Sequence, residues 1–163
     1  HLNGLMDVEV MVRDGEPKVL EIDARLPSQT PTAVLWSSGL NLVDALLETA
    51  SRAAPPAVDR DPRRACVYQH VRAHAGVLEV LGEHVMGSAR PLALVPGFFG
   101  ATEALTDYAA HAPEWSATLI AAATSVAEAR LALDAAVAEA AVFERLKPIP
   151  EDEGLQMEQG ATG

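Results

Sequence analysis

The chain has 163 residues, of which 49% are apolar and 21% charged, a composition typical of a folded, core-forming protein rather than a disordered one. Its 23 acidic and 12 basic side chains give a formal net charge of -11, which argues against nucleic acid and anionic membranes as partners. The single cysteine, Cys66, excludes an internal disulfide, and no apolar run approaches the ~20 residues of a membrane span.

The first predicted element is a β-hairpin. Residues 5–12 and 17–24 both alternate apolar and polar side chains at the two-residue period of a strand. Asp14 and Gly15 between them form one of the strongest short turn signals. A helix does not have this period, so we expect two antiparallel strands.

The length of the loop decides whether Glu9 and Glu21, which are 12 positions apart, face each other. A two-residue turn would send the two side chains to opposite faces, whereas an odd-length loop centred on Gly15 would pair them directly. Pro17 cannot donate a hydrogen bond to a strand ladder, which favours the five-residue loop 13–17. We therefore expect an odd loop and a direct Glu9–Glu21 pair.

The second strand presents Glu21, Asp23 and Arg25 at every second position, so all three point to one face. Spacing alone leaves two interpretations open. The simpler is a solvated face on which Arg25 pairs with Asp23. The other is a magnesium site, because a cation between Glu9 and Glu21 reverses their repulsion, and magnesium prefers carboxylates together with substrate phosphates. Arg25 would then reach a phosphoryl oxygen or a substrate carboxylate.

A helix and a linker follow the hairpin. Asn41 is a typical N-cap for the run 42–54, in which apolar residues recur at helical spacing. Trp36 and the Ser-Ser-Gly after it are expected to pack in the turn before this helix. The segment 55–64 contains three prolines and charges of both signs, which predicts a linker after a first unit, 1–54.

The second unit, 65–147, is predicted to be a small α+β domain. Short apolar runs separated by glycine and proline predict strands over 65–71, 76–81, 83–87, 91–99 and 115–124. Ser125 and Glu128 form a capping-box pattern at the head of a helix from 126 to about 147. The remaining residues, 148–163, are acidic and polar and are expected to form a flexible tail.

Three side chains of the second unit carry chemistry that we interpret as structural. Cys66 lies in an apolar run and is expected to be an inert core thiol. His70 and His74 are four positions apart, but on a strand this spacing does not by itself form a metal pair. We expect them to be core or surface histidines.

The hairpin residues carry a resemblance to a known family. Asp-Val-Glu at 7–9, followed twelve positions on by Leu-Glu-Ile-Asp-Ala-Arg at 20–25, resembles the metal-binding end of the ATP-grasp ligases. That family has Glu on one strand and Glu-x-Asn-x-Arg on the next, so Asp23 departs from the pattern while keeping an oxygen ligand. The longer run 2–47 is similar to a branch of the family that joins two amino acids, and the similarity is looser as far as 124.

The resemblance implies a set of functional residues. Glu9, Glu21 and Asp23 would bind magnesium, with Glu21 bridging two ions and also contacting ATP. Arg25 would lie beside the transferred phosphoryl group, as both a catalytic and an ATP-binding residue. The substrate contacts would come from Ser28, Gln29 and Thr30. For these last three, a turn that satisfies its own backbone stays open as the alternative.

The expected protein is therefore an ATP-dependent ligase that joins a carboxylate to an amine through an acyl phosphate, with ATP, magnesium and small amino acids as its ligands. The resemblance implies that this chain is the C-terminal part of an ATP-grasp fold and is inactive by itself. We expect a cytoplasmic enzyme, with a homodimer as an open alternative. The rival interpretations are an ATP-grasp ligase for other substrates and a non-catalytic binding or dimerisation module.

Overall fold

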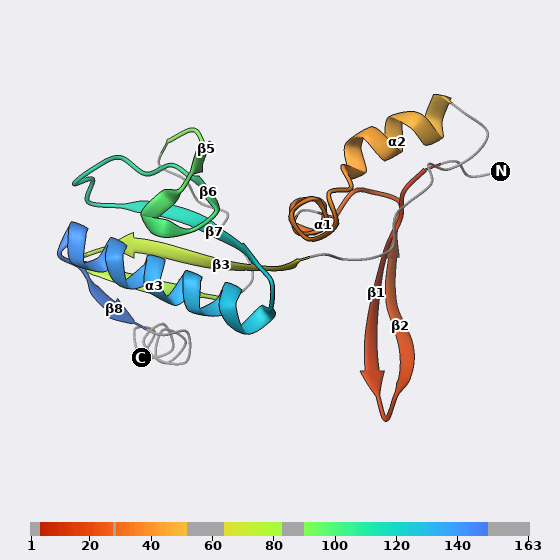
Figure 1. Ribbon diagram of the computed structural model, residues 1–163, viewed down its shortest axis with the longest axis horizontal. Coiled ribbons are helices and arrows are strands. Elements are labelled where there is room, and N and C mark those ends of the chain that lie inside the picture. Colours follow the sequence, from red (N-terminus) through yellow and green to blue (C-terminus); the bar gives the residue numbers. More distant parts are fainter. Residues whose placement is uncertain (1–3, 28, 52–63, 83–89, 150–163) are drawn as a thin grey trace, which may run out of the picture. The chain divides into compact units, whose positions relative to one another are not determined.

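The structure is a computed structural model that describes residues 4–27, 29–51, 64–82 and 90–149. It divides the chain into two compact units, 1–64 and 65–163 (Figure 1). Ser28, the strand predicted over 83–87 and the residues from 150 onward lie outside the described residues. The mixture of helices and strands confirms the predicted α+β class. Among the described helices, none is long and apolar enough to cross a membrane.

The first unit is an antiparallel hairpin followed by two helices. Its elements are β1 (Asp7–Arg13), β2 (Glu16–Asp23), α1 (Thr30–Ser38) and α2 (Leu42–Ser51). Asn41 precedes α2, and its side-chain Oδ1 accepts hydrogen bonds from the backbone N–H of Val43 at 2.9 Å and of Asp44 at 3.4 Å. The predicted N-cap is therefore confirmed, because these bonds satisfy donors that lack a partner inside the helix.

The two faces of the hairpin differ in chemistry. Residues that pair directly across the strands share a face, which makes one face entirely apolar. This apolar face consists of Val8, Val10, Val12, Pro17, Val19 and Ile22. Its four valines and its isoleucine are between 42% and 64% exposed, so the hairpin by itself does not bury them. The opposite face carries the charged residues.

The second unit is a six-stranded sheet with one helix packed against it (Figure 1). The sheet has the order β5-β6-β7-β3-β4-β8, and its one parallel contact among the described strands is β4 with β8. Its elements are β3 (Ala65–His74), β4 (Val77–Leu81), β5 (Ala93–Pro96), the short helix η1 (Phe98–Gly100), β6 (Glu103–Thr106), β7 (Trp115–Ala123), α3 (Val126–Glu144) and β8 (Lys147–Ile149).

The long helix α3 begins where the sequence predicts it. The Oγ of Ser125 accepts a hydrogen bond from the backbone N–H of Glu128 at 3.2 Å, which confirms the predicted N-cap. The Glu128 carboxylate accepts a further hydrogen bond from the Thr124 hydroxyl at 2.5 Å. At the other end Arg145 adopts a left-handed backbone with φ 57°, which ends the helix. The chain can then return as β8, so Pro148 and Ile149, which we expected in the tail, pair with β4.

The core of the second unit combines small and large side chains. Buried alanines predominate where α3 meets the sheet, among them Ala117, Ala121, Ala129, Ala136 and Ala140. Larger side chains fill one end of the core, where the rings of Phe98, Tyr108 and Trp115 pack edge to face with centroids 5.2 to 6.0 Å apart. The short alanines let the helix lie close to the sheet.

A buried carboxylate joins the loop after β6 to the end of α3. The Tyr108 hydroxyl donates a hydrogen bond to Glu144 Oε1 at 2.5 Å, and the backbone N–H of His111 donates to Glu144 Oε2 at 3.0 Å. The Glu144 side chain is only 3% exposed. Burial, and then the bond and charge of Glu144, raise the pKa of Tyr108 to about 12.

Candidate functional site

The turn of the hairpin contains two residues, so the predicted five-residue loop is wrong. Asp14 and Gly15 have φ values of 55° and 80°, the positive values that a tight hairpin turn requires. Arg13 pairs with Glu16 directly beside this turn. Hydrogen-bonded and non-bonded pairs alternate along such a ladder, so the next pair, which contains Pro17, needs no N–H from the proline. The missing N–H of Pro17 therefore does not exclude the two-residue turn.

A β-bulge restores the pairing that the short turn would otherwise destroy. Val10 pairs with Val19, but the next residue of β1, Glu9, pairs with Glu21. Leu20 is the extra residue of β2 at this point. One extra residue reverses which face the following side chains occupy, as an odd loop would have done. The predicted Glu9–Glu21 pair is therefore confirmed, although its cause is the bulge.

A second acidic pair lies beside the first, and one member of it, Asp7, was not among the predicted site residues. Asp7 pairs with Asp23 in the same stretch of the ladder. The sequence contains a signal for this second pair, because positions 7 and 23 are equidistant from Gly15, as positions 9 and 21 are. The end of the hairpin away from the turn therefore carries four carboxylates on one face.

Arg25 is the cation that contacts this face. Its guanidinium lies 2.7 Å from an Asp23 carboxylate oxygen and 3.9 Å from one of Asp7. Within the described residues, Glu9 and Glu21 have no ion-pair partner, and both are exposed. One guanidinium against four carboxylates leaves the face negatively charged. Opposed like charges on a hairpin are destabilising, which favours the binding of a cation here.

The donor set fits a magnesium ion that also has ligands from a substrate. Magnesium in proteins typically binds one or two carboxylates and completes its shell with water and phosphate oxygens. Glu9 and Glu21 supply two carboxylates on one face. Across the described ranges, no three His, Cys, Asp or Glu side chains are gathered so as to hold a metal by themselves. The geometry therefore suits an ion shared with a phosphate-bearing ligand better than a closed protein cage.

The residues expected to contact substrate lie at the start of a helix that we had not predicted. Gln29 is the N-cap of α1, and its carbonyl accepts hydrogen bonds from Thr32 and Ala33 at 3.1 and 3.2 Å. Thr30 is the first residue of the helix. Ser28 lies outside the described residues. Gln29 and Thr30 therefore follow the charged strand closely in sequence and stand at a helix N-terminus.

The turn that we expected around Trp36 is wrong, because Trp36 belongs to the last turn of α1. Gly39 ends that helix with φ 76°, and its N–H donates to the carbonyl of Leu35 at 2.8 Å. Proline in the first turn and glycine just past the end are ordinary helix boundaries. Pro31 and Gly39 occupy these places, so the sequence held the signal for α1.

The histidines of β3 have the structural roles that we expected. His70 is buried, and its Nδ1 lies 2.9 Å from the Thr118 hydroxyl. The Nε2 of His74 lies 3.2 Å from a carboxylate oxygen of Glu79. Cys66 is half-buried rather than fully in the core, and burial, followed by the charge of Glu103, raises the pKa of its thiol. A raised pKa keeps the thiol protonated and unreactive.

Comparisons with known proteins identify relatives of this chain. No family model matches the chain. Over 86 residues it is 44%, 42% and 40% identical to proteins named 3-methyl-D-ornithine–L-lysine ligase from Methanosarcina mazei, Methanosarcina acetivorans and Methanosarcina barkeri. The match covers 52% of this chain but only 23% or 24% of each relative, about a quarter of its length. The resemblance inferred from the hairpin is therefore confirmed by relatives that are named as ligases.

Proposed function

We propose that this chain carries the magnesium- and phosphoryl-binding end of an ATP-dependent carboxylate–amine ligase of the ATP-grasp type. The observation that carries the proposal is the Glu9–Glu21 pair, with Asp7, Asp23 and Arg25 on the same end of the hairpin. Two opposed carboxylates without a cation are destabilising, and a bound magnesium ion makes the same arrangement favourable. The similarity to named ligases supports the same function.

Each residue of the hairpin has a distinct role in this proposal. Glu9 and Glu21 would hold magnesium, Glu21 would also contact ATP, and Asp23 would become a further ligand on releasing Arg25. When bound, magnesium supplies positive charge against the phosphoryl oxygens. Arg25 is held near the site by Asp23 and Asp7, and it would turn its fork of donors to the transferred phosphoryl group. Its role is to stabilise the charge on that group during transfer.

The reaction has two steps. A carboxylate oxygen of the first amino acid attacks the terminal phosphorus of ATP, and ADP leaves, which gives an acyl phosphate. The amine of the second amino acid then attacks the acyl carbon, phosphate leaves, the nitrogen loses a proton to water, and an amide bond remains. By analogy with the named relatives, the carboxylate belongs to 3-methyl-D-ornithine and the amine is the ε-amine of L-lysine. Ser28, Gln29 and Thr30 would help to align these substrates.

The proposal concerns the full-length protein, since this chain spans about a quarter of the relatives that it matches. The remaining nucleotide and amino-acid contacts would lie in the rest of that polypeptide. An enzyme that acts on free amino acids and ATP would work in the cytoplasm. The 163-residue chain alone would not catalyse the reaction.

One observation favours the rival interpretation as a non-catalytic module. The 2.7 Å contact between Arg25 and Asp23 satisfies both charges without a metal, as a solvated surface pair would. Of the four carboxylates, only that of Asp23 lies within hydrogen-bonding distance of Arg25. It leaves the Glu9–Glu21 pair unexplained, which is why we prefer the enzyme.

A coupled assay of ADP release by the full-length protein separates these possibilities. We expect release only when magnesium, ATP, 3-methyl-D-ornithine and L-lysine are all present. Release with magnesium and ATP but with a different pair of amino acids would identify a ligase for other substrates. The absence of release with any amino acid pair would contradict the proposal and favour the non-catalytic module.

A further inference from the structure

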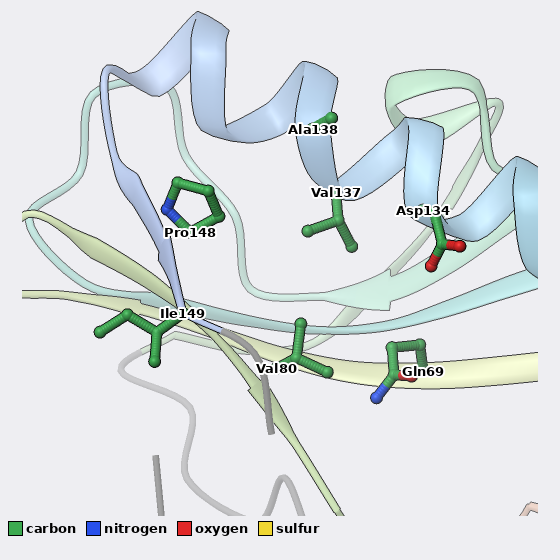
Figure 2. Close-up of a pocket in the computed structure, with 7 residues that line it drawn as sticks. All are labelled: Gln69, Val80, Asp134, Val137, Ala138, Pro148 and Ile149. Carbon is green, nitrogen blue, oxygen red and sulfur yellow. The ribbon is translucent and has the colours of Figure 1, made fainter. Parts of the chain in front are cut away.

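The second unit contains a pocket that the proposed ligase site does not use. It lies between α3 and the strands β3, β4 and β8, and it encloses about 330 Å³ (Figure 2). This volume is at the lower end of the range for small-molecule sites. The pocket's apolar lining consists of Val80, Val137, Ala138, Pro148 and Ile149.

The pocket lies where α3 passes over the β8 edge of the sheet. Ile149 of β8 pairs with Glu79 of β4 at the edge of the sheet, beside Val80. On α3, the side chain of Val137 points toward this edge (Figure 2). Ala138 also lines the pocket, and its methyl side chain leaves space there. The space is therefore closed on one side by the sheet and on the other by the helix. All of the lining side chains named above are aliphatic.

Gln69 and Asp134 are the polar groups of the lining, and the two differ in their hydrogen bonding. The Gln69 amide nitrogen donates to the carbonyls of Leu81 at 3.0 Å and His70 at 3.4 Å, and its oxygen accepts from Arg130 at 3.3 Å. The protein thus already uses both ends of this amide. Gln69 is therefore a poor anchor for a ligand.

Asp134 is different. Its carboxylate points from α3 toward Gln69, and the residue is exposed to solvent where it borders the pocket (Figure 2). Among the described residues it has no ion-pair or hydrogen-bond partner, and Arg130, one helical turn earlier, donates to Gln69. An ionised carboxylate only accepts hydrogen bonds, so a ligand group that replaces water at Asp134 must be a donor.

We propose that this pocket binds a primary ammonium ion carried on a short aliphatic chain. The ammonium group donates to Asp134, and the chain lies against Val80, Val137 and Ile149. A neutral apolar ligand that displaced water from the carboxylate would leave it without a partner, which is unfavourable. An anion would meet Asp134 with a like charge. The described lining contains no aromatic ring, so it lacks the cage that favours quaternary ammonium ions.

The probe for this site is n-pentylammonium chloride, titrated into the full-length protein by isothermal titration calorimetry. We expect saturable binding with a millimolar dissociation constant. Ammonium chloride at the same ionic strength lacks the aliphatic chain, and n-pentanol lacks the positive charge. Both should bind at least about tenfold more weakly than n-pentylammonium.

Variants of α3 locate the binding. Asp134→Asn should weaken it by about tenfold or more, because the charged acceptor is lost. Ala138→Leu should abolish binding by filling the space, while a thermal melt shows an intact fold. Glu139→Gln, which removes an exposed carboxylate of the same helix outside the lining, should bind as the parent does.

Three results would overturn the proposal: no saturable heat with the parent protein, equal binding by Asp134→Asn, or pentanol binding as tightly as the cation. Glu21→Gln should bind the probe normally, since Glu21 lies in the other unit. This control distinguishes the pocket from an amine site of the proposed ligase. Loss of probe binding in Glu21→Gln would also contradict the assignment to the pocket.

Discussion

Glu9 lies directly opposite Glu21 in the β1–β2 hairpin, and the extra residue Leu20 adjoins the pair on β2. Both carboxylates are exposed, and Arg25 is engaged by Asp23 and Asp7 instead. The pair therefore holds two like charges side by side on a strand face. Such a pair destabilises the free hairpin, and a bound cation would turn this repulsion into a favourable interaction.

The first prediction, which rests on the proposed ligase function, is that Glu21→Gln nearly abolishes ADP release by the full-length protein. Glutamine keeps the shape of the side chain but removes the anionic oxygen that magnesium requires, and the loss should be roughly a thousandfold in rate. Thermal stability without nucleotide should not fall, because one repulsive charge is gone. The measurement is ADP release across a magnesium titration, beside a thermal melt.

Two further variants control this prediction. Glu16→Gln removes a glutamate of the same strand that pairs with Arg13 at the turn, and its activity should be close to normal. Glu9→Gln should be impaired, but less than Glu21→Gln if Glu21 bridges two ions. Near-normal activity of Glu21→Gln at low magnesium would sink the metal assignment.

A second prediction concerns the bulge. Deletion of Leu20 should preserve activity within a few-fold, because Glu21 then follows Val19 directly and still pairs with Glu9. Deletion of Ile22, only two positions further on, should abolish activity, since it moves Asp23 to the apolar face. Both deletions are assayed by ADP release in the full-length protein. Equal loss in the two would mean that side-chain facing does not govern the site.

A third prediction concerns the titration of Tyr108. Its pKa is raised from the ordinary value of 10.0 to about 12, first by burial and then by the bond and charge of Glu144. The neutral phenol therefore stabilises the fold below about pH 10, and that contribution is lost as the pH rises toward about 12. Phenolate absorbance should show this late titration, and Tyr108→Phe should remove it. In Glu144→Gln the titration should shift to lower pH; an unchanged curve would contradict the role of Glu144.

A fourth prediction concerns the N-cap of α3. Ser125→Ala removes the acceptor for the Glu128 N–H, and it should lower the free energy of unfolding by about 1 kcal/mol. Ser125→Asp keeps an acceptor and should retain most of the stability. Denaturant unfolding monitored by circular dichroism provides the measurement. A loss in Ser125→Asp as large as that in Ser125→Ala would indicate that the hydrogen bond is not the cause.

The sequence held more of the hairpin than we extracted from it. The direct Glu9–Glu21 pair was predicted from spacing, but with the wrong loop. Val19 and Leu20 are two apolar neighbours in an otherwise alternating strand, and this break in the alternation marks the bulge. Pro17 favoured the wrong loop because hydrogen bonding alternates along a ladder, so the effect of a missing N–H depends on the register, which the sequence alone does not give.

Local signals predicted the starts of α2 and α3, whereas contacts distant in sequence could not be predicted. The caps at Asn41 and Ser125 follow from their own neighbours along the chain. The contact of His70 with Thr118 joins two strands that are 48 positions apart, and it depends on a strand order that alternation does not encode. The pocket between α3 and the strands β3, β4 and β8 depends in the same way on where β8 joins the sheet.

The alanine contact between α3 and the sheet has a consequence for which substitutions the second unit tolerates. Ala121, Ala129, Ala136 and Ala140 are buried where helix and strands meet. At these four positions there is little side chain to truncate, whereas an enlargement meets packed atoms and costs about 1–3 kcal/mol. A saturation library should therefore accept Gly or Ser at these positions more readily than Val or Leu. The hydrophobic substitutions usually regarded as conservative would be the damaging ones.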